Sequence, residues 1–237
     1  MSTYAASAKQ YAQRVVSGEI LTCEWVQKAC KRQLDDLIRF KRKSSIYQFN
    51  PELLDRYGRP YRPADNLCAF IERLPHVKGP LASRMIVLEP WQVFILSTVF
   101  GWIKSDGKRR FRRSYIEVPR GNAKSTIDEQ HAHKTRTVYD VVETGTGKRD
   151  NSLLWVITTA GSNRSGICYE VRSFVTKLLN RVFEDDSQFG IIYGLDEGDD
   201  WTIKDSLIKA NPNWGISVRE EILVPLQAKA MQLPSAV

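Results

Sequence analysis

Residues 115–126 read Tyr-Ile-Glu-Val-Pro-Arg-Gly-Asn-Ala-Lys-Ser-Thr, and the expected fold class follows from them. Its first four residues favour a strand and lack a clean alternation of polar and apolar side chains, so we expect a strand covered on both faces. Residues 125–143 have helical composition and stop near Gly145. The phosphate loop, residues 119–126, thus has the context that phosphate binding needs, because backbone N–H groups at a helix N-terminus then face the anion.

Two further β-rich runs follow, at residues 153–159 and 190–195. The first comes directly after the expected helix, so strand, loop, helix and strand form a βαβ unit, which implies parallel strands. We therefore predict an α/β fold with a P-loop NTPase-like parallel sheet.

Helical patterns flank this core. Residues 4–17 and 23–40 are expected to form amphipathic helices, and residues 88–103 a buried helix with Pro90 in its first turn. Further expected segments are loops and short helices over residues 44–84 and helices over 171–183 and 219–231. We divide the chain into an N-terminal helical and loop region, residues 1–85, and an ATPase-like core, residues 86–237.

Composition sets the class of protein. With 237 residues, 42% of them hydrophobic, and six Trp, the chain is expected to fold as a packed globule. The four cysteines lack Cys-x-x-Cys spacing, which argues against a zinc site or a disulfide framework. Residues 1–10 do not resemble a secretory signal, and the apolar run 91–103 falls short of the roughly 20 residues that cross a bilayer. We expect a cytoplasmic protein.

Charge is unevenly distributed along the chain. Residues 1–126 carry a net charge of +12, whereas residues 127–237 carry −4. A basic half fits a polyanion such as nucleic acid, and a solvated basic face fits equally well. The basic run 108–113 is a candidate DNA or phosphate contact on the first reading and a solvated lead-in to a strand on the second.

The phosphate loop departs from the usual pattern in two places. Lys124 would neutralise charge on the β- and γ-phosphates, and Ser125 would place its hydroxyl on Mg²⁺. The pattern has glycine six residues before the lysine and again directly before it, where this chain has Val118 and Ala123. An ordinary polar loop is the alternative, and the flanking strand and helix favour phosphate binding.

Four stretches together resemble the large terminase subunits of tailed phages, in the order in which that family has them. They are Leu88-Glu89-Pro90-Trp91-Gln92, the phosphate loop with its preceding strand, residues 127–133 (Ile-Asp-Glu-Gln-His-Ala-His) and residues 156–161 (Val-Ile-Thr-Thr-Ala-Gly). Later runs at residues 191–193, 199–201 and 210–212 are also similar to the family.

The resemblance implies roles for individual residues. Trp91 and Gln92 correspond to residues that contact adenine, and the Walker A loop residues that bind phosphate are Arg120, Gly121, Asn122, Ala123, Lys124, Ser125 and Thr126. Ser125 and Asp128 would hold Mg²⁺. The catalytic residues would be Glu129, which orients water, with Arg120, and Thr158 and Thr159, which couple hydrolysis to motion.

The family function implied is ATP-driven translocation of double-stranded DNA into a procapsid. ATP and Mg²⁺ are the implied cofactors. The implied partners are DNA, a portal protein and a small terminase subunit, with a homo-oligomer and no membrane, in the cytoplasm of a bacterial host.

Each motif has a plainer reading. Trp91 could be a core residue, Asp128 and Glu129 could be first-turn helix acids, and Thr158 and Thr159 ordinary strand residues. His131 and His133 could face solvent. A metal site made from these acids and histidines is disfavoured, because one helix cannot aim residues 128, 129, 131 and 133 at one ion.

The spacing between Lys124 and Asp128 conflicts with a complete motor. In the family the Walker B acids, here Asp128 and Glu129, end their own strand, reached through crossovers of at least roughly 10–12 residues. Only three residues separate Lys124 from Asp128. An internal deletion explains this, and it predicts a reduced sheet, an exposed strand edge and weak or absent hydrolysis. We also expect no nuclease domain.

Two alternatives to the motor remain open. One is a non-catalytic terminase remnant that still folds and binds nucleotide or DNA. The other is a basic nucleic-acid-binding module without a nucleotide site.

Overall fold

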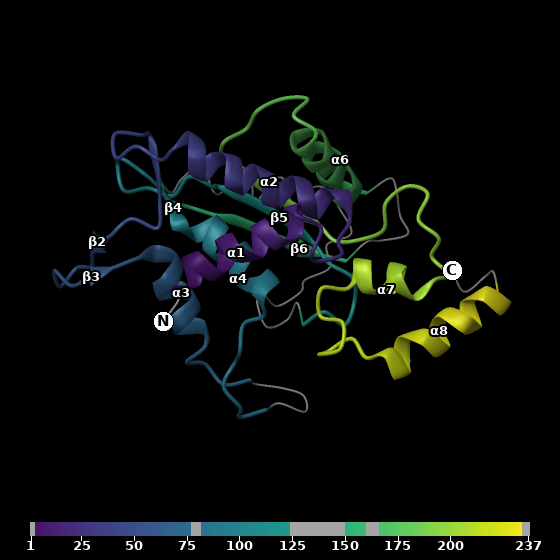
Figure 1. The fold of residues 1–237 in the computed structure, drawn as a ribbon. Coiled ribbons are helices and arrows are strands. Elements are labelled where there is room, and N and C mark those ends of the chain that lie inside the picture. The colour runs from purple at the N-terminus through teal and green to yellow at the C-terminus, as the bar shows by residue number, and fades with distance from the viewer. Residues whose placement is uncertain (1–2, 77–81, 124–149, 160–165, 234–237) are drawn as a thin grey trace.

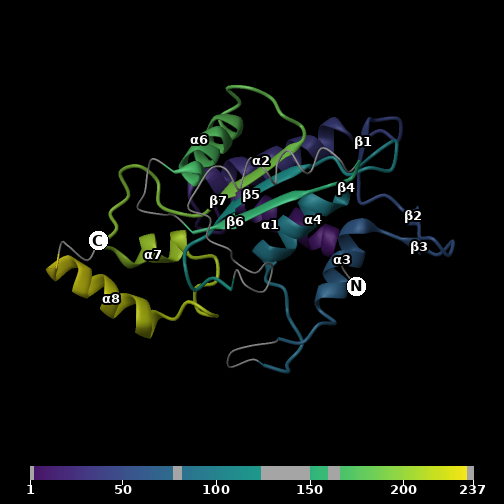
Figure 2. The same ribbon diagram turned by 180° about the vertical axis from the view of Figure 1, so that it is seen from behind.

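A computed structural model describes residues 3–76, 82–123, 150–159 and 166–233 (Figure 1). Within these residues, three parallel strands form the central sheet: β5 (Arg113–Glu117), β6 (Leu154–Thr158) and β7 (Gln188–Ile192). Their order is β6-β5-β7, so the strand that precedes the phosphate loop lies in the middle, as the three labels in Figure 2 show. The parallel sheet predicted from the sequence is confirmed.

The register aligns the three strands at both ends. Arg113 lies opposite Leu154 and Gln188, and Glu117 lies opposite Thr158 and Ile192. All three carboxyl ends therefore meet at one edge of the sheet. The strand before the phosphate loop pairs with the strand that was predicted at residues 153–159.

The outer strands differ in exposure. All five residues of β7 are buried, whereas four of the five residues of β6 are half-buried. Of the two outer strands in the described sheet, β6 is thus the candidate for the exposed edge that the sequence predicts.

Helices α1 (Tyr4–Val16), α2 (Glu24–Arg39) and α4 (Pro90–Gly101) match three of the expected helices. Local sequence explains where they begin. The Thr3 hydroxyl accepts a hydrogen bond from the Ala6 amide (3.2 Å) at the start of α1. At α4, Pro90 occupies the first turn, and Glu89 and Gln92 form a reciprocal capping box.

The remaining elements complete the described fold. Helices α6 (Ile167–Leu179) and α8 (Glu220–Gln232) match predicted helices, and the helix predicted at residues 125–143 lies outside the described residues. The other elements are α3 (Pro63–Ile71), α7 (Lys204–Ala210), β1 (Tyr47–Phe49), β2 (Leu53–Leu54), β3 (Pro60–Tyr61) and β4 (Trp102–Lys104). Helices α7 and α8 lie at the opposite end of the molecule from the β2–β3 hairpin (Figures 1 and 2).

The N-terminal helices share one hydrophobic core with the sheet. Val15 and Val26 are fully buried in the same cluster as Ile116 and Ile191. Specific bonds also join the two halves: the Cys23 thiol donates to the Ile192 carbonyl (3.0 Å). The division at residues 85 and 86 stays a prediction, and the two regions it separates are packed together.

The basic run 108–113 contains a buried cation. Arg110 has no exposed side-chain area, and its Nη1 lies 2.8 Å from Asp36 Oδ2, at an angle that makes the contact an ion pair without a hydrogen bond. Its Nη2 donates to Asp186 Oδ1 (2.6 Å). Four aromatic rings lie within 4.8–5.2 Å of the guanidinium, those of Phe40, Tyr47, Trp102 and Phe111.

Other members of this run also have partners within the protein. Arg112 Nε donates to the Ser152 carbonyl (3.0 Å), and Arg113 pairs with Asp185 (2.9 Å). Lys108 lies 3.3 Å from Asp150. The run is therefore not simply a solvated lead-in to β5, because it joins β5 to α2 and to the segments that precede β6 and β7.

Candidate nucleotide site

The carboxyl ends of the strands position the candidate site. The phosphate loop leaves the central strand β5, and its base is bound to both neighbouring strands. Val118 N donates to the Thr158 carbonyl (3.0 Å), and Tyr193 N donates to the Glu117 carbonyl (2.8 Å). In open α/β sheets, ligands bind outside the carboxyl ends, where the strand order reverses. In this sheet the order reverses at β5.

The loop backbone has left-handed residues at two positions. Gly121 has a φ of +85°, and Ala123 has a φ of +53°. Turns of this kind gather backbone N–H groups into a concavity that binds anions. The described part of the phosphate loop thus has two residues in the conformation that such turns use, and its contact with phosphate stays a prediction.

Ala123 occupies a conformation that favours glycine, at the position where the phosphate-loop pattern has glycine. A left-handed conformation costs an L-residue roughly 1–2 kcal/mol. We expect Ala123→Gly to raise the free energy of unfolding by about 1 kcal/mol, measured by urea titration. The control is Ala6→Gly at an exposed position of helix α1, which should lower it by about 0.5–1 kcal/mol. If Ala123→Gly lowered the free energy of unfolding as much as Ala6→Gly does, Ala123 would not be strained.

Asn122 is the buried residue of the loop. Its side chain is fully buried, and Nδ2 donates to Asn211 Oδ1 (2.8 Å) and to the Pro119 carbonyl (3.1 Å). Its Oδ1 accepts from the Asn213 amide (3.0 Å). The Asn122 side chain thus faces the protein and not solvent.

Trp91 and Gln92 lie at the start of α4, and both are 2% exposed. The Trp91 indole N–H donates to Asn213 Oδ1 (2.6 Å), and its ring packs edge-on against Tyr193. Gln92 Oε1 accepts from the Glu89 amide (2.9 Å) in the capping box. Both side chains are engaged in the fold, and contact with adenine stays a prediction.

The remaining predicted site residues divide into two groups. Arg120 is exposed, and Thr158 and Thr159 are half-buried at the end of β6, where Thr158 Oγ1 donates to the Thr159 carbonyl (3.1 Å). The predicted phosphate, metal and water-orienting residues Lys124, Ser125, Thr126, Asp128 and Glu129 lie outside the described residues. Their roles stay predictions.

Sequence reasoning missed a buried carboxylate beside the loop. Glu117 is 4% exposed, and its Oε2 accepts from the Tyr115 hydroxyl (2.7 Å) while its Oε1 accepts from Arg172 Nε (3.2 Å). Burial, and then the charge of Glu117, raise the pKa of Tyr115 well above its usual value. The available signal was a Glu among the hydrophobic residues of the predicted strand, residues 115–118.

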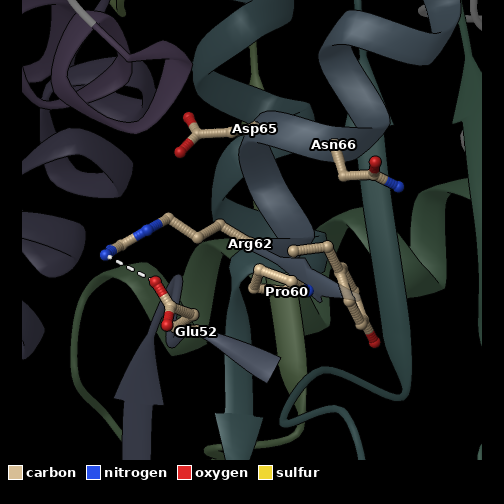
Figure 3. A pocket seen from close by; sticks show the side chains of 6 residues that line it. Glu52, Pro60, Arg62, Asp65 and Asn66 are labelled. Atoms are coloured by element: carbon tan, nitrogen blue, oxygen red, sulfur yellow. Dashed lines mark ion pairs between the residues drawn. The ribbon is translucent and has the colours of Figure 1, made fainter. Parts of the chain in front are cut away.

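A surface hollow of about 410 Å³ lies elsewhere in the fold (Figure 3). It is lined by residues before and within the β2–β3 hairpin and at the start of α3. Glu52 and Arg62 form an ion pair on its wall (3.6 Å). None of its lining residues belongs to the phosphate loop or to the central sheet, so it is separate from the candidate nucleotide site.

Comparisons with known proteins agree with this geometry. The family model of the terminase large subunit ATPase domain matches two segments, residues 90–130 and 126–177. Protein YmfN of Escherichia coli (strain K12) is 48% identical over 106 residues, which are 45% of this chain and 23% of YmfN. The large terminase of bacteriophage HK97 has a similar fold, with a TM-score of 0.57 at 15% identity, over 73% of this chain and 52% of that one.

The chain therefore spans less than a quarter of YmfN and about half of the HK97 protein. The family match covers β5, the phosphate loop and β6 together with α4 and most of α6. Among the helices that the structure describes, none has the length and apolar character to cross a membrane.

Proposed function

Since this chain carries a terminase large-subunit ATPase region, we propose that it binds ATP with Mg²⁺ at the loop after β5 and hydrolyses it weakly or not at all. The active form of such a region would drive double-stranded DNA into a procapsid. The observation that carries the proposal is the position of β5, central in a parallel sheet and running into a loop with left-handed residues at 121 and 123.

The binding half of the proposal rests on the chemistry of the loop. Backbone N–H groups of the loop would surround the phosphates, and Lys124 would neutralise part of their charge. Ser125 and Asp128 would hold Mg²⁺, which supplies charge neutralisation at the β- and γ-phosphates. Gly121 has no side chain to obstruct a phosphate, and Arg120 is exposed beside it.

The second half, impaired hydrolysis, rests on the short spacing between Lys124 and Asp128. Both neighbours of β5 in the described sheet, β6 and β7, begin after residue 150, far downstream of Asp128. The three residues between Lys124 and Asp128 are too few for a strand, which averages about five or six residues. The family match also comes in two segments that share residues 126–130, which supports a shortening at this point.

ATP binding and phosphate release, measured with radiolabelled ATP, test the proposal. We expect the unchanged protein to bind ATP, Lys124→Ala to weaken binding at least tenfold, and turnover to be weak or absent in both. The control is Lys177→Ala, which removes the same charge from an exposed position of α6 and should leave binding unchanged. If the unchanged protein hydrolyses ATP, and Glu129→Ala abolishes hydrolysis while ATP binding persists, the proposal of impaired hydrolysis is wrong.

Double-stranded DNA is the partner that we propose. The net charge of +12 over residues 1–126 supports contact with phosphate backbones, and affinity should then fall steeply with salt. The side chains of run 108–113 mostly contact other residues of the protein. The exposed run 41–43 (Lys-Arg-Lys) after α2 is therefore the better candidate for contact with the DNA backbone. Salt-sensitive DNA binding without ATP binding would instead support a nucleic-acid-binding module. Assembly with a portal protein, a small terminase subunit or further copies stays a prediction.

A further inference from the structure

We propose that residues 211–217, here called the asparagine turn, position the phosphate loop for nucleotide and connect it to Trp91. Asn211, Asn213 and Ser217 are the positioning residues. This inference rests on the proposed function and adds to it a part of the chain outside both matched family segments.

The asparagine turn holds the loop through side chain and backbone at once. Asn122, fully buried, donates to Asn211 Oδ1 (2.8 Å) and accepts from the Asn213 amide (3.0 Å). A third hydrogen bond involves the backbone of the loop: Ser217 Oγ donates to the Gly121 carbonyl (2.6 Å). Together these bonds fix the two residues that precede Ala123.

Asn213 connects the phosphate loop to Trp91, which is predicted to contact adenine. It is 1% exposed, and its Oδ1 accepts from the Trp91 indole N–H (2.6 Å). Its Nδ2 donates to Ser217 Oγ (3.0 Å), and its backbone N–H donates to Asn122. One buried side chain therefore connects the start of α4 with the phosphate loop.

The asparagine turn is itself rigidly attached. Gly215 N donates to the Val218 carbonyl (2.9 Å), and Asn211 Nδ2 donates to the Leu207 carbonyl in α7 (2.9 Å). Helix α7 is held in turn by Lys209, which lies 2.6 Å from Asp196. Among the described residues, the loop is thus supported by a turn that is itself bonded to α7 and, through Lys209, to Asp196.

This support has a consequence for binding. A loop that is already held in its left-handed turn loses less conformational freedom when a phosphate binds, so affinity is higher for the same contacts. Removing a support should therefore weaken nucleotide binding without any loss of contact between protein and nucleotide. The effect should be visible at Ser217, because that side chain is exposed and its removal creates no cavity.

The test compares Ser217→Ala with Ser217→Thr, which keeps the hydroxyl. We expect Ser217→Ala to weaken ATP binding about fivefold to tenfold and to speed amide hydrogen exchange in residues 118–123, with the urea midpoint close to that of the unchanged protein. Ser217→Thr should restore both properties. The control is Ser17→Ala, which removes a comparable hydroxyl-to-carbonyl bond at the end of α1 (3.0 Å) and should change neither.

The outcomes separate the two ideas. If the unchanged protein binds ATP and Ser217→Ala binds it equally well, the positioning role is wrong and the proposed function stands. If the unchanged protein does not bind ATP, the proposed function is wrong and the positioning role falls with it. Unchanged hydrogen exchange in Ser217→Ala would show that the asparagine turn does not hold the loop.

Discussion

Asp36→Asn is expected to lower the free energy of unfolding by about 3 kcal/mol, because it leaves the buried guanidinium of Arg110 without its most buried counter-charge. The second carboxylate, Asp186, has a side chain 34% exposed, so water shares its interaction with Arg110. The aromatic rings around Arg110 exclude water from the cation and cannot replace a carboxylate. Urea titration measures the change as a shift in midpoint.

The neighbouring residue provides a matched control. Asp35, on the same helix, pairs with Lys31 (3.1 Å) and with Arg181, but its side chain is 38% exposed. Exposed pairs contribute roughly 0–1 kcal/mol, so Asp35→Asn should change stability by about 0.5 kcal/mol or less. Arg110→Met combined with Asp36→Leu should lose less than Asp36→Asn alone, because no unpaired charge is left buried. Equal effects at Asp35 and Asp36 would contradict the buried-charge explanation.

Gly190→Ala is the second prediction with a large effect. A Cβ atom at Gly190, in the buried strand β7, would lie 2.3 Å from Val175 Cγ1 and 3.3 Å from Val175 Cβ, on helix α6. Val175 is fully buried and β-branched, so it cannot easily rotate away. Because overpacking a core costs typically 1–3 kcal/mol, we expect a loss near the upper end, about 2–3 kcal/mol, in urea titration.

Gly194→Ala is the control for this prediction, because no atom lies within 4 Å of a Cβ built there. It should change stability by less than about 0.5 kcal/mol. Adding Val175→Ala to Gly190→Ala should recover part of the loss, since it removes the two methyl groups that obstruct the new Cβ. A double variant less stable than either single variant would mean that the close approach is not the cause.

The sequence was sufficient to predict strands and helices whose residue pattern matches the structure that they form. The run 115–118 lacks polar alternation and forms the strand that is covered on both sides, and the pairing of β5 with β6 follows from the βαβ order. Two strands begin earlier than predicted, at Arg113 and Gln188. The Arg113 side chain pairs with Asp185 (2.9 Å), and the Gln188 carbonyl accepts from Arg32 Nη1 (2.8 Å).

Contacts between distant residues could not be foreseen in this way. Run 108–113 is basic throughout except at Phe111, and composition does not show which arginine meets Asp36 from α2 and which remains near solvent. Asn211 and Pro212 were noted for their resemblance to a family, and nothing local indicates that Asn211 contacts Asn122. Trp91 fits the core reading, because its ring is buried and its indole N–H donates to Asn213, and its contact with adenine stays a prediction.

The central position of β5 also determines when the protein can fold during synthesis. Arg113 pairs with Leu154 on one side and with Gln188 on the other, and both partners leave the ribosome long after it. Helices α1 and α2 emerge before the three strands, yet the core that covers Val15 and Val26 includes Ile191. Because contacts of such long sequence separation slow folding, the nascent N-terminal half must keep apolar surface exposed until residue 192 has been made, which is the interval in which a chaperone would bind it.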